Sequence, residues 1–317
     1  MALLEGKVAV VTGAAQGLGF ATAAELAAQG ATVVIADLHK AKAEAAAKEL
    51  SAKGLKVFAA LLDVTDTASV NSTFDRVVAE HGSLDVLVNS AGLGQQLAPL
   101  TGLSDAVSLS SLWVSFRIAP LPHRSVFLCA ELEDGEWDRV INVTLTGSFR
   151  CCRAAGAIME QQESGTIVNF SSINGQNPAP LAGAYNIAKA GVISLTRTLA
   201  LELAAYGVRV NCISPGPVYT DFNKSVMSQR ARIAGIEVDQ QVSNVGKAVP
   251  LGRWGEPDDI ANMVAYLAGP KAAWMTGEIV RVSGGMEGVG SAPPKRAPKP
   301  EKSLSQQQPA TATASRL

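Results

Sequence analysis

The first thirty residues place a glycine-rich turn between a predicted strand and a predicted helix. Residues 7–12 form a short, β-branched apolar run, which is typical of a buried parallel strand. A turn containing Gly13, Gly17 and Gly19 follows, and a helix is expected over residues 20–29. Glycines permit a tight turn and let a pyrophosphate approach the backbone, while the helix N-terminus attracts the anion. This order of elements predicts a dinucleotide-binding unit.

A second apolar strand, expected over residues 32–36, ends at Asp37. A carboxylate at this point can accept hydrogen bonds from both hydroxyls of an adenosine ribose, and it would repel a 2′-phosphate. Leu38 follows the carboxylate, and residues 14–16 of the turn supply no cation. The pattern therefore predicts NAD rather than NADP as the cofactor.

The rest of the chain alternates between apolar runs and stretches with a helical pattern. Its 317 residues, 47% of them hydrophobic, are enough for one large core. We expect an α/β fold, a Rossmann-type doubly wound parallel sheet, in a single domain over residues 1–289. Further strands are expected near residues 55–60, 84–89, 165–171, 208–213 and 278–282, and further helices near residues 40–53, 67–81, 136–162, 183–205 and 257–268.

A tyrosine and a lysine suited to proton transfer lie in the predicted helix 183–205. Tyr185 and Lys189 are four positions apart, so they share one helix face. The ammonium would lower the pKa of the phenol from its usual value of about 10, and such a phenol can exchange a proton with an alcohol or carbonyl. Ser172 follows the predicted strand 165–171 at the end where α/β folds bind ligands. A Tyr-x-x-x-Lys pair alone also arises by chance on an exposed helix.

Further motifs stand in a fixed order along the chain, at residues 12–19, 63–64, 89–92, 141–147, 215–220, 252–261 and 276–285. With them the chain resembles the short-chain dehydrogenase/reductase family over about residues 4–289, apart from one insertion. Ser90 and Ser283 depart from the residues common in that family, which are Asn and Asp.

The resemblance implies a role for each residue of a candidate active site. Tyr185 would be the acid/base, and Lys189 would lower its pKa and hold the nicotinamide ribose. Ser172 would hydrogen-bond the substrate oxygen, and Asn142 would support a water relay to Lys189. The implied activity is hydride transfer between NAD and a secondary alcohol or ketone.

The resemblance also implies cofactor contacts and an assembly. Subunits would associate through the helices 136–162 and 183–205 into a homotetramer or homodimer. The expected cofactor-binding residues are Gly13, Gln16, Gly17, Leu18, Gly19, Asp37, Asp63, Val64, Asn89, Ala91, Gly92, Tyr185, Lys189, Pro215, Gly216, Val218 and Thr220.

The stretch between Asn89 and Asn142 is about twice as long as the family usually has. Its surplus, residues 107–130, shows no clean helical or strand period. One explanation is a lid over the site. The other, which we favour, is a retained intron, because Val107-Ser108 can be encoded by a splice-donor sequence and residues 127–131 by a pyrimidine tract ending in CAG. An alternative function follows from the insertion: a non-catalytic NAD-binding sensor or scaffold with an obstructed site.

The last segment, residues 290–317, is rich in Pro, Lys, Ser, Gln, Ala and Thr, and we expect it to be disordered. It ends in Ser315-Arg316-Leu317, which resembles the Ser-Lys-Leu signal read by the peroxisomal import receptor. The expected location is the peroxisome, with the cytoplasm as the alternative.

Composition argues against several other classes of function. A net charge of −1 provides no excess of positive charge for binding nucleic acid or an anionic membrane. No uncharged apolar run reaches 18 residues, so no membrane span is expected, and the early first strand leaves no room for a signal peptide. The four Cys and three His do not have disulfide-framework or metal-ligand spacing, so we expect no metal.

Overall fold

The computed structural model describes residues 3–97 and 132–286. The insertion 107–130 and the tail 290–317 lie outside these residues, as do the predictions made for them. Within the described chain, seven parallel strands form one sheet in the order β3-β2-β1-β4-β5-β6-β7, which confirms the predicted Rossmann-type fold. The strands are β1 (Val8–Thr12), β2 (Thr32–Asp37), β3 (Val57–Leu61), β4 (Val86–Asn89), β5 (Gly165–Phe170), β6 (Val208–Pro215) and β7 (Ile279–Val282).

The strand order reverses beside β1, which pairs with β2 on one side and with β4 on the other. The chain builds outward to β3 in one direction and then returns to build outward to β7 in the other. In such sheets the crevice at the carboxyl ends of the two diverging strands is the usual ligand site. Here the turns after Thr12 and Asn89 lie at this crevice.

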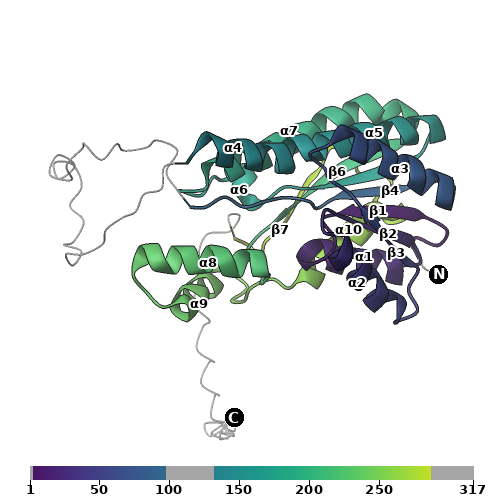
Figure 1. Ribbon diagram of the computed structural model, residues 1–317. Helices are drawn as coiled ribbons and strands as arrows, with labels where there is room; N and C mark the ends of the chain where they lie inside the picture. Colours follow the sequence, from purple (N-terminus) through teal and green to yellow (C-terminus); the bar gives the residue numbers. More distant parts are fainter. Residues whose placement is uncertain (1–2, 98–131, 287–317) are drawn as a thin grey trace, which may run out of the picture.

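Helices cover both faces of the sheet (Figure 1). One face carries α1 (Gly17–Ala28), α2 (Lys40–Ser51) and α10 (Pro257–Ala268). The opposite face carries α3 (Thr67–His81), α5 (Gly147–Gln162) and α7 (Gly183–Leu203). Because both faces are covered, the central strands are mostly apolar, and every residue of β1 and β4 is buried, including the polar Thr12 and Asn89 at their carboxyl ends.

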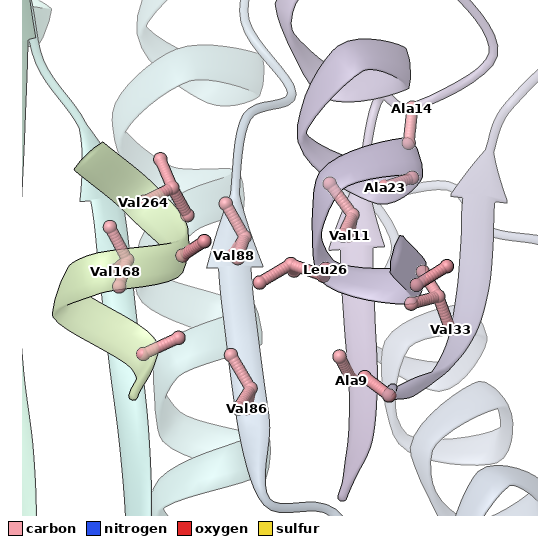
Figure 2. Packing of buried hydrophobic residues seen from close by; sticks show 14 of the residues in the cluster. Ala9, Val11, Ala14, Ala23, Leu26, Val33, Val86, Val88, Val168 and Val264 are labelled. Atoms are coloured by element: carbon pink, nitrogen blue, oxygen red, sulfur yellow. The ribbon is translucent and has the colours of Figure 1, made fainter. Parts of the chain in front are cut away.

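Small and branched side chains fill the space between α1 and the sheet. Figure 2 shows Leu26 of α1 lying against Val11 of β1 and Val88 of β4. These three residues are fully buried. Burying a leucine side chain contributes roughly 1.5–3 kcal/mol, so this layer fixes the helix whose N-terminus faces the glycine turn.

The prediction of one continuous helix over residues 136–162 is wrong, because the structure interrupts the helix. It consists of α4 (Asp134–Ile141), a π-helical turn η2 (Asn142–Thr146) and α5. The amide of Gly147 donates to the carbonyl of Asn142, five residues back. A Cβ at Gly147 would lie 2.8 Å from Val64 Cγ2, so the helix packs closely there. Such turns are frequent at functional sites.

Several other elements also differ from the sequence predictions. Helix α1 begins at Gly17 rather than residue 20. The helices α8 (Asp221–Ala234) and α9 (Val238–Ala248) were not predicted, because their sequences are mostly polar with short apolar stripes. The remaining short helices are α6 (Ile173–Gln176), η3 (Ala204–Tyr206) and η4 (Pro270–Ala272). Among the described helices, none is long and apolar enough to cross a membrane.

Candidate active site

The glycine turn after β1 packs directly against the turn after β4. Gly13 has a φ of +63°, and a Cβ added there would lie 2.7 Å from Ala91 Cα. A Cβ on Gly19 would lie 2.6 Å from the Gly13 carbonyl oxygen. The amide of Ala91 donates to Thr12 Oγ1 at 3.1 Å, which holds the two turns together. Only glycine fits at positions 13 and 19, and this is the cradle that a pyrophosphate requires.

Helix α1 begins above this cradle without a side-chain cap. Its first residue is Gly17, with a φ of +61°, and its N-cap residue Gln16 accepts no hydrogen bond through its side chain. The first-turn amides of such a helix can donate to an anion. Leu18 turns toward the core and packs on the α1 side of the sheet.

The Asp37 carboxylate is held at the edge of the same turn. One oxygen, Oδ2, accepts from the Ala15 amide at 3.1 Å, and Oδ1 accepts from the His39 amide at 3.0 Å. Leu38 is 56% exposed beside it. The carboxylate is therefore fixed in position where a nucleotide ribose would meet the turn.

Asp63 and Val64 follow β3 and form the neighbouring wall. Asp63 Oδ1 accepts from both the amide (2.8 Å) and the hydroxyl (2.7 Å) of Thr65, which orients the carboxyl group. Val64 is buried against Gly147 of α5. This pair thus links the third strand to the start of α5.

The side chain of Asn89 lies inside the sheet layer. Its Nδ2 donates to Asn169 Oδ1 at 2.9 Å and to Cys152 Sγ at 3.1 Å, and Asn169 in turn donates to Thr196 Oγ1 at 3.0 Å. This chain of polar groups ties β4 to β5, α5 and α7. Asn89 is 2% exposed, so its side chain braces the floor of the crevice.

Lys189 is buried below Gly92. A Cβ on Gly92 would lie 3.4 Å from Lys189 Nζ, and the ammonium donates to the Phe170 carbonyl at 2.7 Å. Burial lowers the pKa of Lys189 to about 8. Glycine at position 92 therefore leaves room for the lysine nitrogen at the crevice between β4 and β5.

Tyr185 and Ser172 are brought together at the end of β5. A hydrogen bond with Ser172 acts to lower the pKa of Tyr185, but burial of the phenol outweighs it and raises that pKa above its usual value. Lys189 Nζ lies 5.7 Å from the Tyr185 ring centroid. The structure thus gives the phenol pKa the opposite direction from the sequence expectation, because desolvation of the buried phenol exceeds the effect of the Ser172 hydrogen bond.

Asn142 stands at the start of the π turn. Its Oδ1 accepts from Arg150 Nη1 at 2.9 Å, and the same nitrogen donates to the Val64 carbonyl at 3.3 Å. Arg150 therefore joins the π turn to the wall that carries Asp63. Arg150 was not predicted as a site residue, since an arginine within a helix carries no local signal.

The segment after β6 forms the remaining edge of the crevice. A Cβ on Gly216 would lie 2.7 Å from Ser283 Cα, so Pro215 and Gly216 run close along β7. Val218 is buried, and Thr220 caps α8 by accepting from the Asn223 amide at 3.4 Å. These residues place α8 over the crevice.

A cavity of about 850 Å³ opens between α4, α8 and residues 94–96. Phe222 of α8 forms part of its wall, and its ring centroid lies 5.9 Å from that of Tyr185. Phe222 also contacts Gly94, where a Cβ would lie 2.7 Å from the ring. The other lining residues are Gln95, Gln96, Leu132, Glu133, Gly135, Glu136, Arg139, Ser225, Val226 and Gln229. Sequence reasoning named none of these residues.

The described residues offer no rival centre for metal or thiolate chemistry. No group of three or more His, Cys, Asp or Glu could hold a metal ion among them. Cys151, Cys152 and Cys212 are buried and free. Burial raises the pKa of Cys152 to about 12 and that of Cys212 to about 11, so neither is a ready nucleophile.

Comparison with known families agrees with this geometry. The family described as short chain dehydrogenase matches residues 7–117, and that described as enoyl-(acyl carrier protein) reductase matches residues 118–287. The chain belongs to the short-chain dehydrogenase/reductase family. The two matches meet inside the insertion 107–130.

Three proteins similar to this chain are named for chemistry at hydroxyl or keto groups. The 3-oxoacyl-[acyl-carrier-protein] reductase of Staphylococcus aureus is 36% identical over 281 residues, covering 88% of this chain and 98% of the relative. An NAD⁺-bound xylitol dehydrogenase is 30% identical with a TM-score of 0.77, covering 89% and 99% of the two chains. An actinorhodin polyketide ketoreductase solved with NADPH is 32% identical with a TM-score of 0.75, covering 90% and 99%. The chain is thus an oxidoreductase of a family that binds NAD or NADP.

Proposed function

We propose that the protein is an NAD-dependent oxidoreductase that transfers a hydride between the nicotinamide and a secondary alcohol or ketone. The observation that carries the cofactor preference is the Asp37 carboxylate, fixed by the Ala15 and His39 amides. A 2′-phosphate placed here would meet a negative charge. Leu38 supplies no cation to offset it.

The glycine cradle and α1 would hold the pyrophosphate, and Asp37 the adenosine ribose. Lys189, whose Nζ lies beneath Gly92, would hold the nicotinamide ribose. When bound, the nicotinamide supplies or accepts the hydride, while the protein orients it against the substrate carbon.

Tyr185 would transfer the proton. Its raised pKa keeps the phenol protonated near neutral pH, so it can donate to a carbonyl oxygen during reduction. In the oxidative direction the phenol must first lose its proton, so oxidation should be favoured as pH rises. Ser172, already hydrogen-bonded to the phenol, would bind the same substrate oxygen.

The cavity between α4 and α8 would hold the rest of the substrate. Leu132, Phe222 and Val226 give it an apolar wall. Arg139 and Glu136 form an ion pair with an Nε to Oε2 distance of 2.7 Å at the cavity. Their charges are matched to each other, so the pair does not call for a charged substrate.

A non-catalytic sensor or scaffold is not favoured. Such a protein would need the cofactor cradle only, whereas Ser172, Tyr185 and Lys189 lie close together, and Tyr185 packs near Phe222 of the cavity wall. Convergence of three proton-handling side chains is a requirement of catalysis rather than of binding.

We also propose that subunits associate through α5 and α7. Each helix presents a large apolar side chain to the surface, Phe149 at 42% exposure and Leu201 at 83%. Light scattering on the purified protein tests this, and a monomer at micromolar concentration would contradict it.

The function is tested by turnover on a panel of secondary alcohols and ketones with NAD(H) and NADP(H), alongside NADH binding measured by fluorescence. We expect turnover with at least one substrate and a preference for NAD(H). Tight NADH binding with no turnover across a broad panel would instead support the sensor.

A further inference from the structure

Helix α7, which carries Tyr185, starts without a cap from its own segment. Its N-cap residue is Ala182, whose methyl group cannot accept a hydrogen bond. The residue before it, Leu181, has a φ of +66°, a conformation that a branched side chain rarely adopts. The start of the helix that positions the phenol therefore depends on contacts from elsewhere in the chain.

Gln95 supplies these contacts from ninety positions away. Its Oε1 accepts from the Tyr185 amide at 3.0 Å, at the third residue of α7. Its Nε2 donates to the Leu181 carbonyl at 3.2 Å. The Tyr185 amide is one that an ordinary N-cap side chain would satisfy. Gln95 is 5% exposed, so water cannot readily replace these bonds.

The segment that carries Gln95 is itself held by side chains of two further helices. Arg139 and Glu136 of α4 bond to the Gly94 carbonyl (3.3 Å) and the Gln96 amide (3.1 Å). Gln229 of α8 accepts from the Leu97 amide at 2.9 Å. Both helices border the candidate substrate cavity, so the position of this segment depends on the walls of that cavity.

We propose that Gln95 is a positioning residue that caps the catalytic helix and sets the place of the Tyr185 phenol. This inference rests on the proposed function. Its amide group acts on the reaction through the backbone of Tyr185 and Leu181, not by binding substrate. Small errors in the place of a reacting group are costly, and about 1 Å can reduce the rate on the order of 100-fold.

The test compares Gln95→Leu with Gln162→Leu. Gln162 is a matched control, because it also accepts from and donates to backbone, at Leu84 (3.0 and 2.9 Å), near the amino ends of the strands. We expect Gln95→Leu to lower kcat at least tenfold, with KM for two substrates of different size and the Kd of NADH each changed less than threefold. Gln162→Leu should leave kcat within twofold of the wild type.

A rise in KM with kcat retained would overturn the proposal, since it would make Gln95 a substrate contact. Gln95→Glu keeps the acceptor oxygen, so we expect it to recover most of the lost turnover at pH values where the buried carboxyl is protonated. Failure of a folded, NADH-binding Glu variant to recover turnover at any pH would also overturn it.

Hydrogen exchange tests the cap without catalysis. In the wild-type protein the Tyr185 amide should be protected to within tenfold of the Asn186 amide, which bonds to the Ala182 carbonyl within the helix. An unprotected Tyr185 amide would overturn the inference even if Gln95→Leu does not fold. Absence of any turnover by the wild type would instead reject the proposed function. Hydrogen exchange at the Tyr185 amide would then still show whether Gln95 caps α7.

Discussion

Replacing Asp37 should change the choice between NAD and NADP more than any other single substitution. The carboxylate makes two backbone hydrogen bonds, to Ala15 and His39, so it cannot move away from an approaching phosphate without losing them. Two unit charges about 4 Å apart repel by about 1 kcal/mol in water and about 4 kcal/mol near a protein surface. A phosphate carries roughly −1.5 to −2 charges.

The partly exposed carboxylate belongs near the lower of these values. The expected discrimination against NADP is therefore about 1.4 kcal/mol or more, which is at least roughly tenfold in kcat/KM. Asp37→Asn should reduce it to within about threefold. Adding Leu38→Arg should reverse it, because residue 38 is 56% exposed and an arginine there can pair with the phosphate.

Steady-state kcat/KM for NAD and NADP at low and high salt measures this effect. The preference of the wild type should weaken at high salt because the charges are screened. Asp85→Asn is the control: that carboxylate also bonds a backbone amide, at Val8, but near the amino ends of the strands. Equal use of both cofactors by the wild type, or an unchanged ratio in Asp37→Asn, would show that Asp37 does not set the cofactor preference.

Three further predictions concern the cradle, the buried lysine and the insertion. Gly13→Ala should weaken NADH binding, measured by titration, at least tenfold and lower the free energy of unfolding by about 1–3 kcal/mol, because its Cβ would meet Ala91. The control Gly82→Ala should bind NADH normally, because a Cβ at position 82 has nothing within 4 Å. Folding lowers the pKa of Lys189 from 10.5 to about 8, so the unfolded chain binds more protons between these values and the wild type should gain stability as pH rises through this window. Between pH ~7.5 and ~9.5, the free energy of unfolding measured in urea should rise by about 1–2 kcal/mol more for the wild type than for Lys189→Met. A smaller rise for the wild type than for Lys189→Met would contradict this prediction. A protein lacking residues 107–130 should be more soluble and at least as active in the same assay; loss of activity in a folded deletion would identify a lid.

The parts of the site that depend on local sequence were predictable. Gly13 and Asp37 lie in a short strand-turn-helix-strand unit, whose order is visible in the residues themselves. The pattern of apolar strands likewise predicted the parallel sheet. These features follow from neighbours in the chain, so one sequence is enough to show them.

Features that depend on packing could not be predicted in this way. The π turn at Asn142 is a single turn within a longer helix. It is too short to change the helical pattern of apolar residues in the sequence. The direction of the Tyr185 pKa shift is set by burial. The spacing of Tyr185 and Lys189 along one helix does not show how deeply the phenol is buried. Gln95 reaches Tyr185 across ninety positions, and no local pattern connects them.

The turnover of Tyr185→Phe decides whether Tyr185 is the acid/base, because this substitution removes only the hydroxyl that would transfer the proton. The ring still packs beside Phe222, so folding and NADH binding should persist. We expect kcat to fall on the order of 100-fold or more, while Tyr206→Phe, in the short helix η3, should keep normal turnover. Near-normal turnover in a folded Tyr185→Phe variant would contradict the assignment of Tyr185 as the acid/base.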